Sequence, residues 1–435
     1  MDLDPSPDEA AFRAEARSWL AAHVPTAPLP SLETAEGFAA HRAWERILAA
    51  NGWSVVSWPR RYGGRGASTT EWLLFEQEYY AAGAPGRVSQ NGTQLLAPTL
   101  FAHGTAEQRA RVLPPMADGE VIWAQAWSEP EAGSDLAALR ATARRTSGGW
   151  LLYGQKTWSS RAAFADRAFG LFRGGPAGER PHQGLTYVMF PLDAPGVTVR
   201  PIRRLDGKPA FAELFLDGVF VPDRDVIGEP GQGWRVAMST AGSERGLTLR
   251  SPGRFTAAAA RLAALWRERA DPADTALRDR VADAVIAARA YHLRACATAT
   301  RETEAAASRA AETRAGEARA AETRSGTRAS ARATVRRAAT AATARAADRQ
   351  RADNPAEASV NKVFWSELDL ALHETALDLL GPYGELSDAA ADAPGGGRWA
   401  EGYVFSLAGP VYAGTNEIQR DIIAERLLGL DRGRR

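Results

Sequence analysis

Cysteine is nearly absent from this sequence of 435 residues, which contains one, Cys296. A single thiol excludes a disulfide framework within one chain, and it excludes a metal site built from several thiolates. The six histidines include no pair spaced i, i+4 and no H-E-x-x-H motif. The sequence therefore predicts no metal centre.

Long apolar runs are absent as well. No segment approaches the ~20 consecutive apolar residues that a transmembrane helix needs. The first residues, MDLDPSPDEAAFRAEARSWL, are acidic and lack the apolar run of a secretory signal. The formal net charge is +1, so bulk charge gives no reason to expect binding to nucleic acid or to an acidic membrane. We therefore expect a cytoplasmic protein that binds neither.

What the sequence does contain is a helical pattern, then a β pattern, then a second helical pattern. In residues 1–120 apolar residues recur at helical spacing, as in Asp8–His23, Phe38–Leu48 and Glu71–Ala82. In residues 121–233 short runs such as WLLYGQKTW and LTYVMFPL lie between turn signals, which predicts a compact barrel or sandwich. Residues 234–435 return to helical spacing. The order predicts an α+β protein of three domains, with clefts at the junctions where cofactors often bind.

One stretch of the last domain has an unusual composition. Residues 300–351 consist almost entirely of Ala, Arg, Thr, Glu and Ser, and RAAETR occurs twice. Alanine and arginine favour helix, but large apolar side chains that could pack are nearly missing. We interpret the stretch as a solvated insertion, partly helical or disordered, rather than as a nucleic-acid-binding arm.

Two stretches of the β region carry side chains suited to a polar ligand. WAQAWSEPEAGSDLAAL, Trp123–Leu139, places hydroxyls and small residues after a short aromatic strand. GQKTWSSRAAFAD, Gly154–Asp166, places a tryptophan before two serines, so that an indole could lie on a flat cofactor while a hydroxyl reaches a ring nitrogen. Taken alone, the first is more often a strand-to-loop connector and the second more often a core tryptophan.

Together with the C-terminus, these stretches resemble the acyl-CoA dehydrogenase family. The family's Ser/Thr-Glu-Pro loop with Ala-Gly-Ser-Asp stands here as Ser128–Asp135, and its Gly-x-Lys-x-Trp-x-Thr/Ser stands as Gly154–Ser160. Its Gly-Thr-x-Glu-Ile-x-Arg helix start stands as Gly414–Arg420. The matches occur in order and span the chain outside the Ala/Arg-rich stretch. The resemblance implies an N-terminal helical domain, a β-barrel-like middle domain and a C-terminal four-helix bundle.

The resemblance also implies bound FAD and a set of residues that contact it or the substrate. The cofactor, which carries the redox chemistry, would be held by Gln125, Trp127, Ser128, Trp158, Ser160, Thr415 and Glu417. Ser134 falls where the family contacts the acyl-CoA. We also expect Asn416 and Gln419 to cap the helix that begins near Thr415.

The catalytic base is the main departure from many family members. Removing the α proton of an acyl thioester requires a positioned carboxylate, but the residue before Gly414 is Ala413, which can accept no proton. Other members place the glutamate on the helix after the β domain, followed by arginine, and Glu244-Arg245 stands there. We therefore predict Glu244 as the base, Arg245 as a substrate contact and the backbone N–H of Ala413 as a donor to the thioester oxygen. Without the resemblance, the sequence favours a solvent-facing helix residue at Glu244, which is the commoner position of a glutamate.

Two further departures concern the contacts between subunits. The family's Arg-x-x-Phe-Gly stretch has no match between residues 250 and 300, and its pyrophosphate loop appears as Asp378–Gly384 with Asp378 and Pro382 at altered positions. Proline cannot donate a backbone N–H. Relatives with such losses include heterotetramers of two related subunits, so a homodimer, a homotetramer and a heterotetramer are all compatible with the sequence.

The predicted function is FAD-dependent dehydrogenation of an acyl-CoA to the 2,3-enoyl-CoA, with electrons passed to an electron-transfer flavoprotein. Two alternatives remain open. One is a flavin-dependent monooxygenase or oxidase of the same fold. The other is a non-catalytic scaffold subunit of a heteromeric acyl-CoA dehydrogenase.

Overall fold

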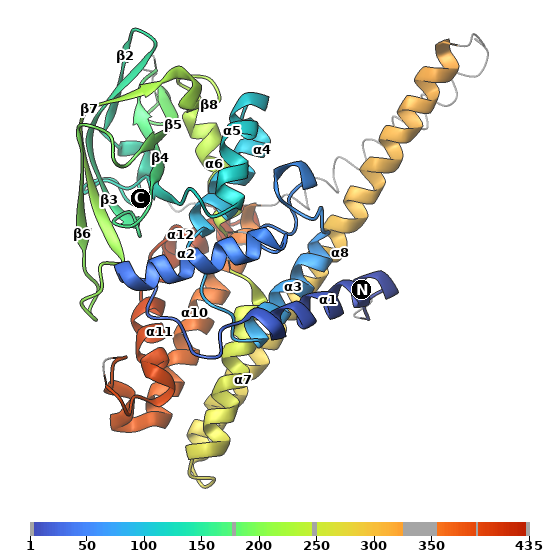
Figure 1. The fold of residues 1–435 in the computed structure, drawn as a ribbon, viewed down its shortest axis with the longest axis vertical. Helices are drawn as coiled ribbons and strands as arrows, with labels where there is room; N and C mark the ends of the chain where they lie inside the picture. The colour runs from blue at the N-terminus through green and yellow to red at the C-terminus, as the bar shows by residue number, and fades with distance from the viewer. Residues whose placement is uncertain (1–3, 176–179, 246–249, 325–354, 389, 432–435) are drawn as a thin grey trace.

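The computed structural model describes residues 4–175, 180–245, 250–324, 355–388 and 390–431, and for 243–245, 302, 305–307, 309–324 and 355 it describes the backbone only. Helices form both ends of the chain and a sheet forms the middle (Figure 1). The predicted α+β class and the order of helical, β and helical regions are confirmed.

The N-terminal region is a group of helices with well-defined starts. Its elements are α1 Pro7–His23, α2 Ala35–Ala50, α3 Thr69–Ala81, the π-helix η2 Asn91–Leu96, α4 Ala97–His103 and α5 Ala106–Ala117. Capping boxes open α1, α3 and α5, where a Ser or Thr side chain and a Glu or Gln side chain satisfy each other's backbone N–H groups. The core between α1, α2 and α3 includes Trp44, Trp53 and Phe75. The three helices predicted in this region are thus confirmed.

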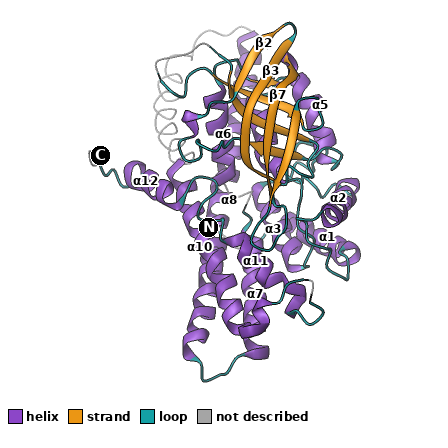
Figure 2. Cartoon of the chain, turned by 90° about the vertical axis from the view of Figure 1, so that its left-hand side faces the viewer, coloured by secondary structure: helices purple, strands orange, loops and turns teal. Residues whose placement is uncertain are grey.

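The middle region is one mixed, curled sheet (Figure 2). Its strands are β1 Trp123–Ala126, β2 Thr142–Thr146, β3 Gly149–Ser160, β4 Arg167–Arg173, β5 Leu185–Pro191, β6 Val197–Ile202, β7 Phe211–Pro222 and β8 Val226–Ile227. The order is β6-β7-β3-β2-β4-β5-β8, and β1 pairs in parallel with β4. Because β4 and β5 are buried at almost every position, both of their faces are covered: one by the sheet's own interior and the other by α6 and the N-terminal helices.

Helices dominate the C-terminal region. They are α6 Gly233–Arg245, α7 Pro252–Arg269, α8 Thr275–Arg324, α10 Pro355–Leu380, α11 Arg398–Ser406 and α12 Asn416–Arg426. One core joins α7, α8, α10 and α11 through Phe255, Tyr291, Trp365 and Trp399. The backbone of the Ala/Arg-rich stretch is helical as far as Arg324, and α8 projects away from the body of the molecule there (Figure 1). The rest of that stretch lies outside the described residues.

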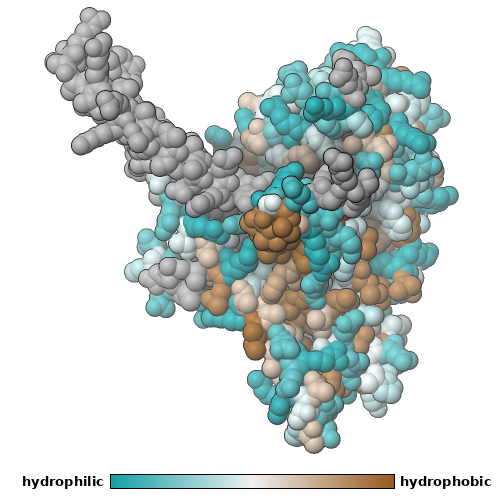
Figure 3. Space-filling model, turned by 180° about the vertical axis from the view of Figure 1, so that it is seen from behind, coloured by the Kyte–Doolittle hydropathy of each residue, from teal (hydrophilic) through white to brown (hydrophobic). Residues whose placement is uncertain are grey.

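Two kinds of feature are absent from the described part of the chain. No described helix combines the length and the apolar character needed to cross a membrane. No group of three or more His, Cys, Asp or Glu side chains in the described ranges is arranged to hold a metal ion. Apolar side chains gather on the face opposite to that of Figure 1 (Figure 3), and the exposed large apolar residues include Leu427, Leu428 and Leu430 near the C-terminus.

Candidate functional site

The two polar stretches of the β region lie side by side. The backbone N–H of Thr157 on β3 donates to the carbonyl oxygen of Ser128 at 2.8 Å, just beyond the end of β1. This bond brings the predicted cofactor residues of β1 and its loop (Gln125, Trp127, Ser128) beside those of β3 (Trp158, Ser160). Ser134 is exposed farther along the same loop, at the rim of this group.

A buried ion pair locks these stretches together. Lys156 is fully buried, and its Nζ donates to Glu129 Oε1 at 2.8 Å, to the Leu171 carbonyl at 2.7 Å and to the Trp127 carbonyl at 3.3 Å. Burial lowers the pKa of Lys156 to about 8, although the Glu129 carboxylate beside it acts in the opposite direction.

Glu129 fixes the other end of the same loop. Its two oxygens accept the backbone N–H groups of Arg140 at 2.6 Å and Ala141 at 3.0 Å. Glu129 therefore has a structural hydrogen-bonding role, and the three donors of Lys156 join its carboxylate to the carbonyls of Trp127 and of Leu171 on β4.

A β-bulge turns Trp158 outward. The pairing of β3 with β7 slips between Lys156 and Ser159, where one extra residue enters β3, and Trp158 adopts φ 59°. Such bulges re-aim side chains, and a non-glycine residue at positive φ costs about 1–3 kcal/mol. The indole is 60% exposed, although Phe211 packs edge-on to it with ring centroids 5.9 Å apart.

These residues fit a flat aromatic cofactor. A strained backbone presents an exposed indole, and two nearby buried polar atoms, Ser159 Oγ and Trp127 Nε1, have no hydrogen-bond partner within the described part of the chain. Exposed aromatic faces and unpaired buried polar atoms are both unfavourable until a ligand covers them. Ser159 was not among the predicted cofactor residues, because the family resemblance assigned the hydroxyl contact to Ser160.

Side-chain contacts connect this group to α6. Tyr187 on β5 packs edge-on against Trp127, with ring centroids 6.2 Å apart, and its hydroxyl lies 3.1 Å from Thr240 Oγ1. Thr240 also lies 2.6 Å from Thr99 Oγ1 of α4. Position 244 is one helical turn beyond Thr240, so it lies on the same face of α6. The side chains of Glu244 and Arg245 lie outside the described residues.

The C-terminal loop that contains Ala413 is held in a strained conformation. Ala413 has φ 58°. Gln419 Nε2 donates to the carbonyls of Ala413 and Gly414 at 3.2 and 3.4 Å. Buried Lys362 of α10 closes the base of the loop by donating to Asn416 Oδ1 at 2.7 Å and to the Pro410 carbonyl at 3.1 Å. The loop conformation therefore does not depend on the side chain at position 413.

The expected cap of α12 is wrong. Thr415 is the N-cap, with its Oγ1 accepting the N–H of Ile418 at 3.3 Å. Asn416 and Gln419 point instead to Lys362 and to the loop carbonyls. The exposed carboxylate of Glu417 lies in the first turn, where hydrogen bonds from its own backbone N–H and from Thr415 lower its pKa. Thr415 and Glu417 thus lie on α12, which packs against α10, rather than on the strands that carry Trp158.

Arg250 joins the Ala413 loop to the chain that follows α6. Its Nη2 donates to the Tyr412 hydroxyl at 2.8 Å, and its guanidinium lies over the rings of Tyr412 and Trp365 at 5.2 and 5.1 Å. Arg250 follows Glu244 by six residues in the sequence, and its contact with Tyr412 ties the segment after α6 to the Ala413 loop. No sequence motif marked Arg250, because its partners lie more than 100 residues away.

A carboxylate with a raised pKa lies on α3. Burial raises the pKa of Glu76 to about 7, and a hydrogen bond from Ser251 and the charge of Arg87 offset only part of this effect. The native state therefore binds more protons than the unfolded state between the ordinary pKa of about 4.3 and about 7. Stability supplied by this group is present at low pH and is lost as the pH rises through that window.

Replacing Glu76 with glutamine should remove this pH dependence. Glutamine keeps a hydrogen-bond acceptor for Ser251 but does not titrate. We expect equal thermal midpoints for Glu76→Gln and wild type near pH 4.5, and a midpoint roughly 3–10 °C higher for the variant at pH 8. Calorimetry across this range measures the difference, and a difference that does not change with pH would contradict the assignment.

Comparison with known proteins gives a consistent result along the chain. Family models of the acyl-CoA dehydrogenase N-terminal, middle and C-terminal domains match residues 6–120, 124–219 and 289–428. Acyl-CoA dehydrogenase IpdE1 of Mycobacterium tuberculosis (strain ATCC 25618 / H37Rv) is 36% identical over 429 residues, which are 97% of each chain. The ChsE4-ChsE5 complex from Mycobacterium tuberculosis superposes with a TM-score of 0.74 at 26% identity, covering 100% of both chains. The Tcur3481-Tcur3483 steroid ACAD has a TM-score of 0.77 at 24% identity, with the same coverage.

Proposed function

The chain belongs to the acyl-CoA dehydrogenase family, and from this premise we propose that it is an FAD-dependent enzyme that converts an acyl-CoA to the 2,3-enoyl-CoA. The observation that carries the proposal is the line of contacts from Trp127 through Tyr187 to Thr240. It joins the proposed cofactor group to the face of α6 on which position 244 lies.

Glu244 is the proposed general base. The α proton of a thioester is too weakly acidic for water at neutral pH, so a carboxylate in a desolvated site must take it. The backbone N–H of Ala413 would donate to the thioester oxygen as negative charge develops there. Two features support this role: the fixed φ of Ala413, and the hydrogen bonds from Gln419 that hold the loop carbonyls. Arg245 follows the base and is proposed to contact the substrate.

The cofactor would lie against β1 and β3. Gln125, Trp127, Ser128, Trp158 and Ser160 would hold its ring system. Thr415 and Glu417 would contact its adenosine half, and Ser134 would contact the CoA. When bound, FAD supplies the acceptor for the β hydride. The exposed indole of Trp158 and the unpaired Ser159 Oγ are the features of the described chain that favour this placement.

The proposed partners are an electron-transfer flavoprotein and either copies of this chain or a related subunit. The resemblance places the family's pyrophosphate loop at Asp378–Gly384. In this chain α10 instead runs to Leu380, and a 3-10 turn, Gly381–Glu385, follows it without a glycine-rich loop. This difference supports a heteromer, because relatives that have lost such a loop include heterotetramers. Asp378 is paired with Arg280 at 2.5 Å, so its carboxylate is already engaged within the chain. The exposed apolar residues near the C-terminus are a candidate subunit interface.

Anaerobic titration with a panel of acyl-CoA thioesters tests the proposed function. The protein, purified with FAD, should lose its visible flavin absorbance with a preferred substrate and release the enoyl-CoA. Oxygen consumption with a hydroxylated product would favour the monooxygenase or oxidase alternative. A chain that stays colourless after FAD addition, both alone and with a related subunit, would favour the scaffold alternative.

A further inference from the structure

The turn that carries the exposed indole is strained at both ends. Trp158 and Arg161 have φ 59° and 56°, and among the described non-glycine residues only Ala413 shares a positive φ. Such conformations persist only where the surroundings hold them. The contacts of Arg161 therefore bear on the orientation of Trp158.

A buried carboxylate from the N-terminal region holds Arg161. Glu33 Oε1 accepts from Arg161 Nη2 at 2.8 Å and from Nε at 3.2 Å, and the two side chains are 4% and 17% exposed. The backbone N–H of Glu33 donates to Ser31 Oγ at 3.4 Å. A charged pair at this depth is screened little by solvent, and two N–H groups of the guanidinium donate to one oxygen of the carboxylate.

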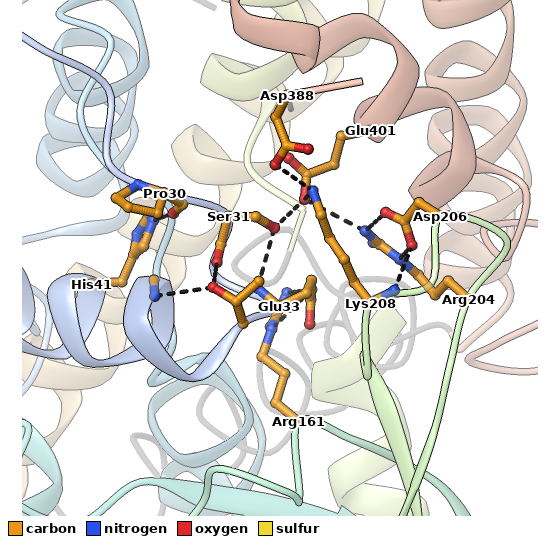
Figure 4. A network of polar contacts seen from close by, with 12 residues as sticks. Pro30, Ser31, Glu33, His41, Arg161, Arg204, Asp206, Lys208, Asp388 and Glu401 are labelled. Carbon is orange, nitrogen blue, oxygen red and sulfur yellow. Dashed lines mark hydrogen bonds and ion pairs between the residues drawn. The ribbon is translucent and has the colours of Figure 1, made fainter. Parts of the chain in front are cut away.

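A second set of contacts holds the hairpin loop between β6 and β7. Arg204 pairs with Asp206, and Lys208 Nζ lies 2.8 Å from Asp388 Oδ2 and 3.2 Å from Glu401 Oε1. Asp388 and Glu401 belong to the C-terminal region, so this loop is tied to the helical bundle. Glu401 also accepts from Ser31 Oγ, which joins this set to the first (Figure 4).

The two sets meet at the strained turn. The backbone N–H of Arg161 donates to the carbonyl of Ala210, the last residue of the hairpin loop, at 2.8 Å. The next residue, Phe211, packs against the Trp158 ring. We name these contacts the polar junction, which consists of Ser31, Glu33, Arg161, Arg204, Asp206, Lys208, Asp388 and Glu401.

We infer that Glu33 and Arg161 are positioning residues that set the orientation of Trp158 against the cofactor. The polar junction brings Glu33 to the turn, and it brings carboxylates of the C-terminal region to the hairpin loop that is bonded to the turn. Positive φ at Trp158 and Arg161 needs such surrounding contacts to persist. This inference rests on the proposed function, because it assigns the indole to the flavin. Neither residue touches the reacting atoms; they act through the backbone of the turn.

The double variant Glu33→Gln/Arg161→Gly tests the inference. Glycine adopts positive φ without strain, and glutamine leaves no unpaired buried charge. The fold should therefore survive while the ion pair between Glu33 and Arg161 is lost. The matched control is Asp223→Asn/Arg145→Gln, which removes an exposed ion pair at the opposite end of β3. The readouts on the FAD-loaded protein are thermal midpoint, FAD affinity and emission of the bound flavin, since an electron-rich indole stacked on a flavin quenches its fluorescence.

The expected result is a double variant with brighter bound flavin and an FAD Kd raised about tenfold, with a midpoint close to that of the control. Bound flavin as dark as in wild type, with Kd within about twofold, would overturn the inference. Should the double variant fail to fold, Glu33→Asp, which shortens the carboxylate by one methylene, replaces it under the same two criteria.

A failure of the proposed function is distinguishable from a failure of this inference. Wild-type protein that binds no FAD, alone or with a related subunit, contradicts the former. Hydrogen exchange at the backbone amide of position 161, corrected for the intrinsic exchange rate of the residue there, then decides the latter without any cofactor. Faster exchange in the double variant than in the control supports a turn held by the polar junction, and equal exchange overturns it.

Discussion

Glu244→Gln should keep the bound flavin and lower the rate of its reduction by acyl-CoA by roughly 10²–10⁴-fold, the contribution of a positioned general base. Glutamine matches the size of glutamate but cannot accept the α proton. The face of α6 that includes position 244 is fixed by Thr240, whose hydroxyl lies within hydrogen-bond distance of Tyr187 and Thr99. We therefore expect the flavin spectrum and FAD affinity to stay unchanged while the reaction is lost.

Stopped-flow absorbance under anaerobic conditions measures this rate. The matched control is Glu107→Gln on the exposed first turn of α5, which should react like wild type. The pH profile adds a second criterion, because the wild-type rate should rise through the pKa of the base and the residual rate of the variant should not. Rapid flavin reduction by the variant would refute Glu244 as the base.

The helices and the order of the three regions could be predicted because they depend on local patterns. Ser68 and Glu71, three positions apart in the sequence, form a capping box, and apolar residues repeat at helical spacing after it. The motif that contains Lys156 and Trp158 likewise predicted that some of the proposed cofactor residues lie on a strand. What these patterns could not give is the bulge at Trp158, because the extra residue is defined only by pairing with β7, more than 50 residues later.

Long-range polar contacts were also beyond the sequence. Glu33 looks like any glutamate in a loop, yet it is buried and paired with Arg161, 128 residues away. Arg250 gave no signal, although it ties Tyr412 of the Ala413 loop to the segment after α6. Charged residues are usually exposed, so a sequence gives no means of telling which ones the fold draws inward. The same reason explains the wrong cap: Asn416 suits a helix start, but buried Lys362 competes for its oxygen.

Lys156→Met should be the most destabilising single change in the β region. It leaves the Glu129 carboxylate buried beside two backbone donors but without its counter-charge, a loss of about 3–5 kcal/mol. The carbonyls of Trp127 and Leu171 lose their donor as well. We expect the thermal midpoint to fall by roughly 5–15 °C. FAD affinity should fall too, because the loop that follows β1 is no longer held against β3.

The double variant Lys156→Met/Glu129→Gln separates charge from packing. Removing both members of a buried ion pair costs much less than removing one, since no charge is then left without a partner. The double variant should therefore recover at least half of the lost midpoint, because glutamine can still accept from the N–H groups of Arg140 and Ala141. Calorimetry of the wild type, of the two single variants Lys156→Met and Glu129→Gln, and of the double variant yields the coupling energy between the two side chains. A coupling near zero would mean that Lys156 acts through its carbonyl contacts alone. The stability of the loop that follows β1 would then depend on hydrogen bonds rather than on the ion pair.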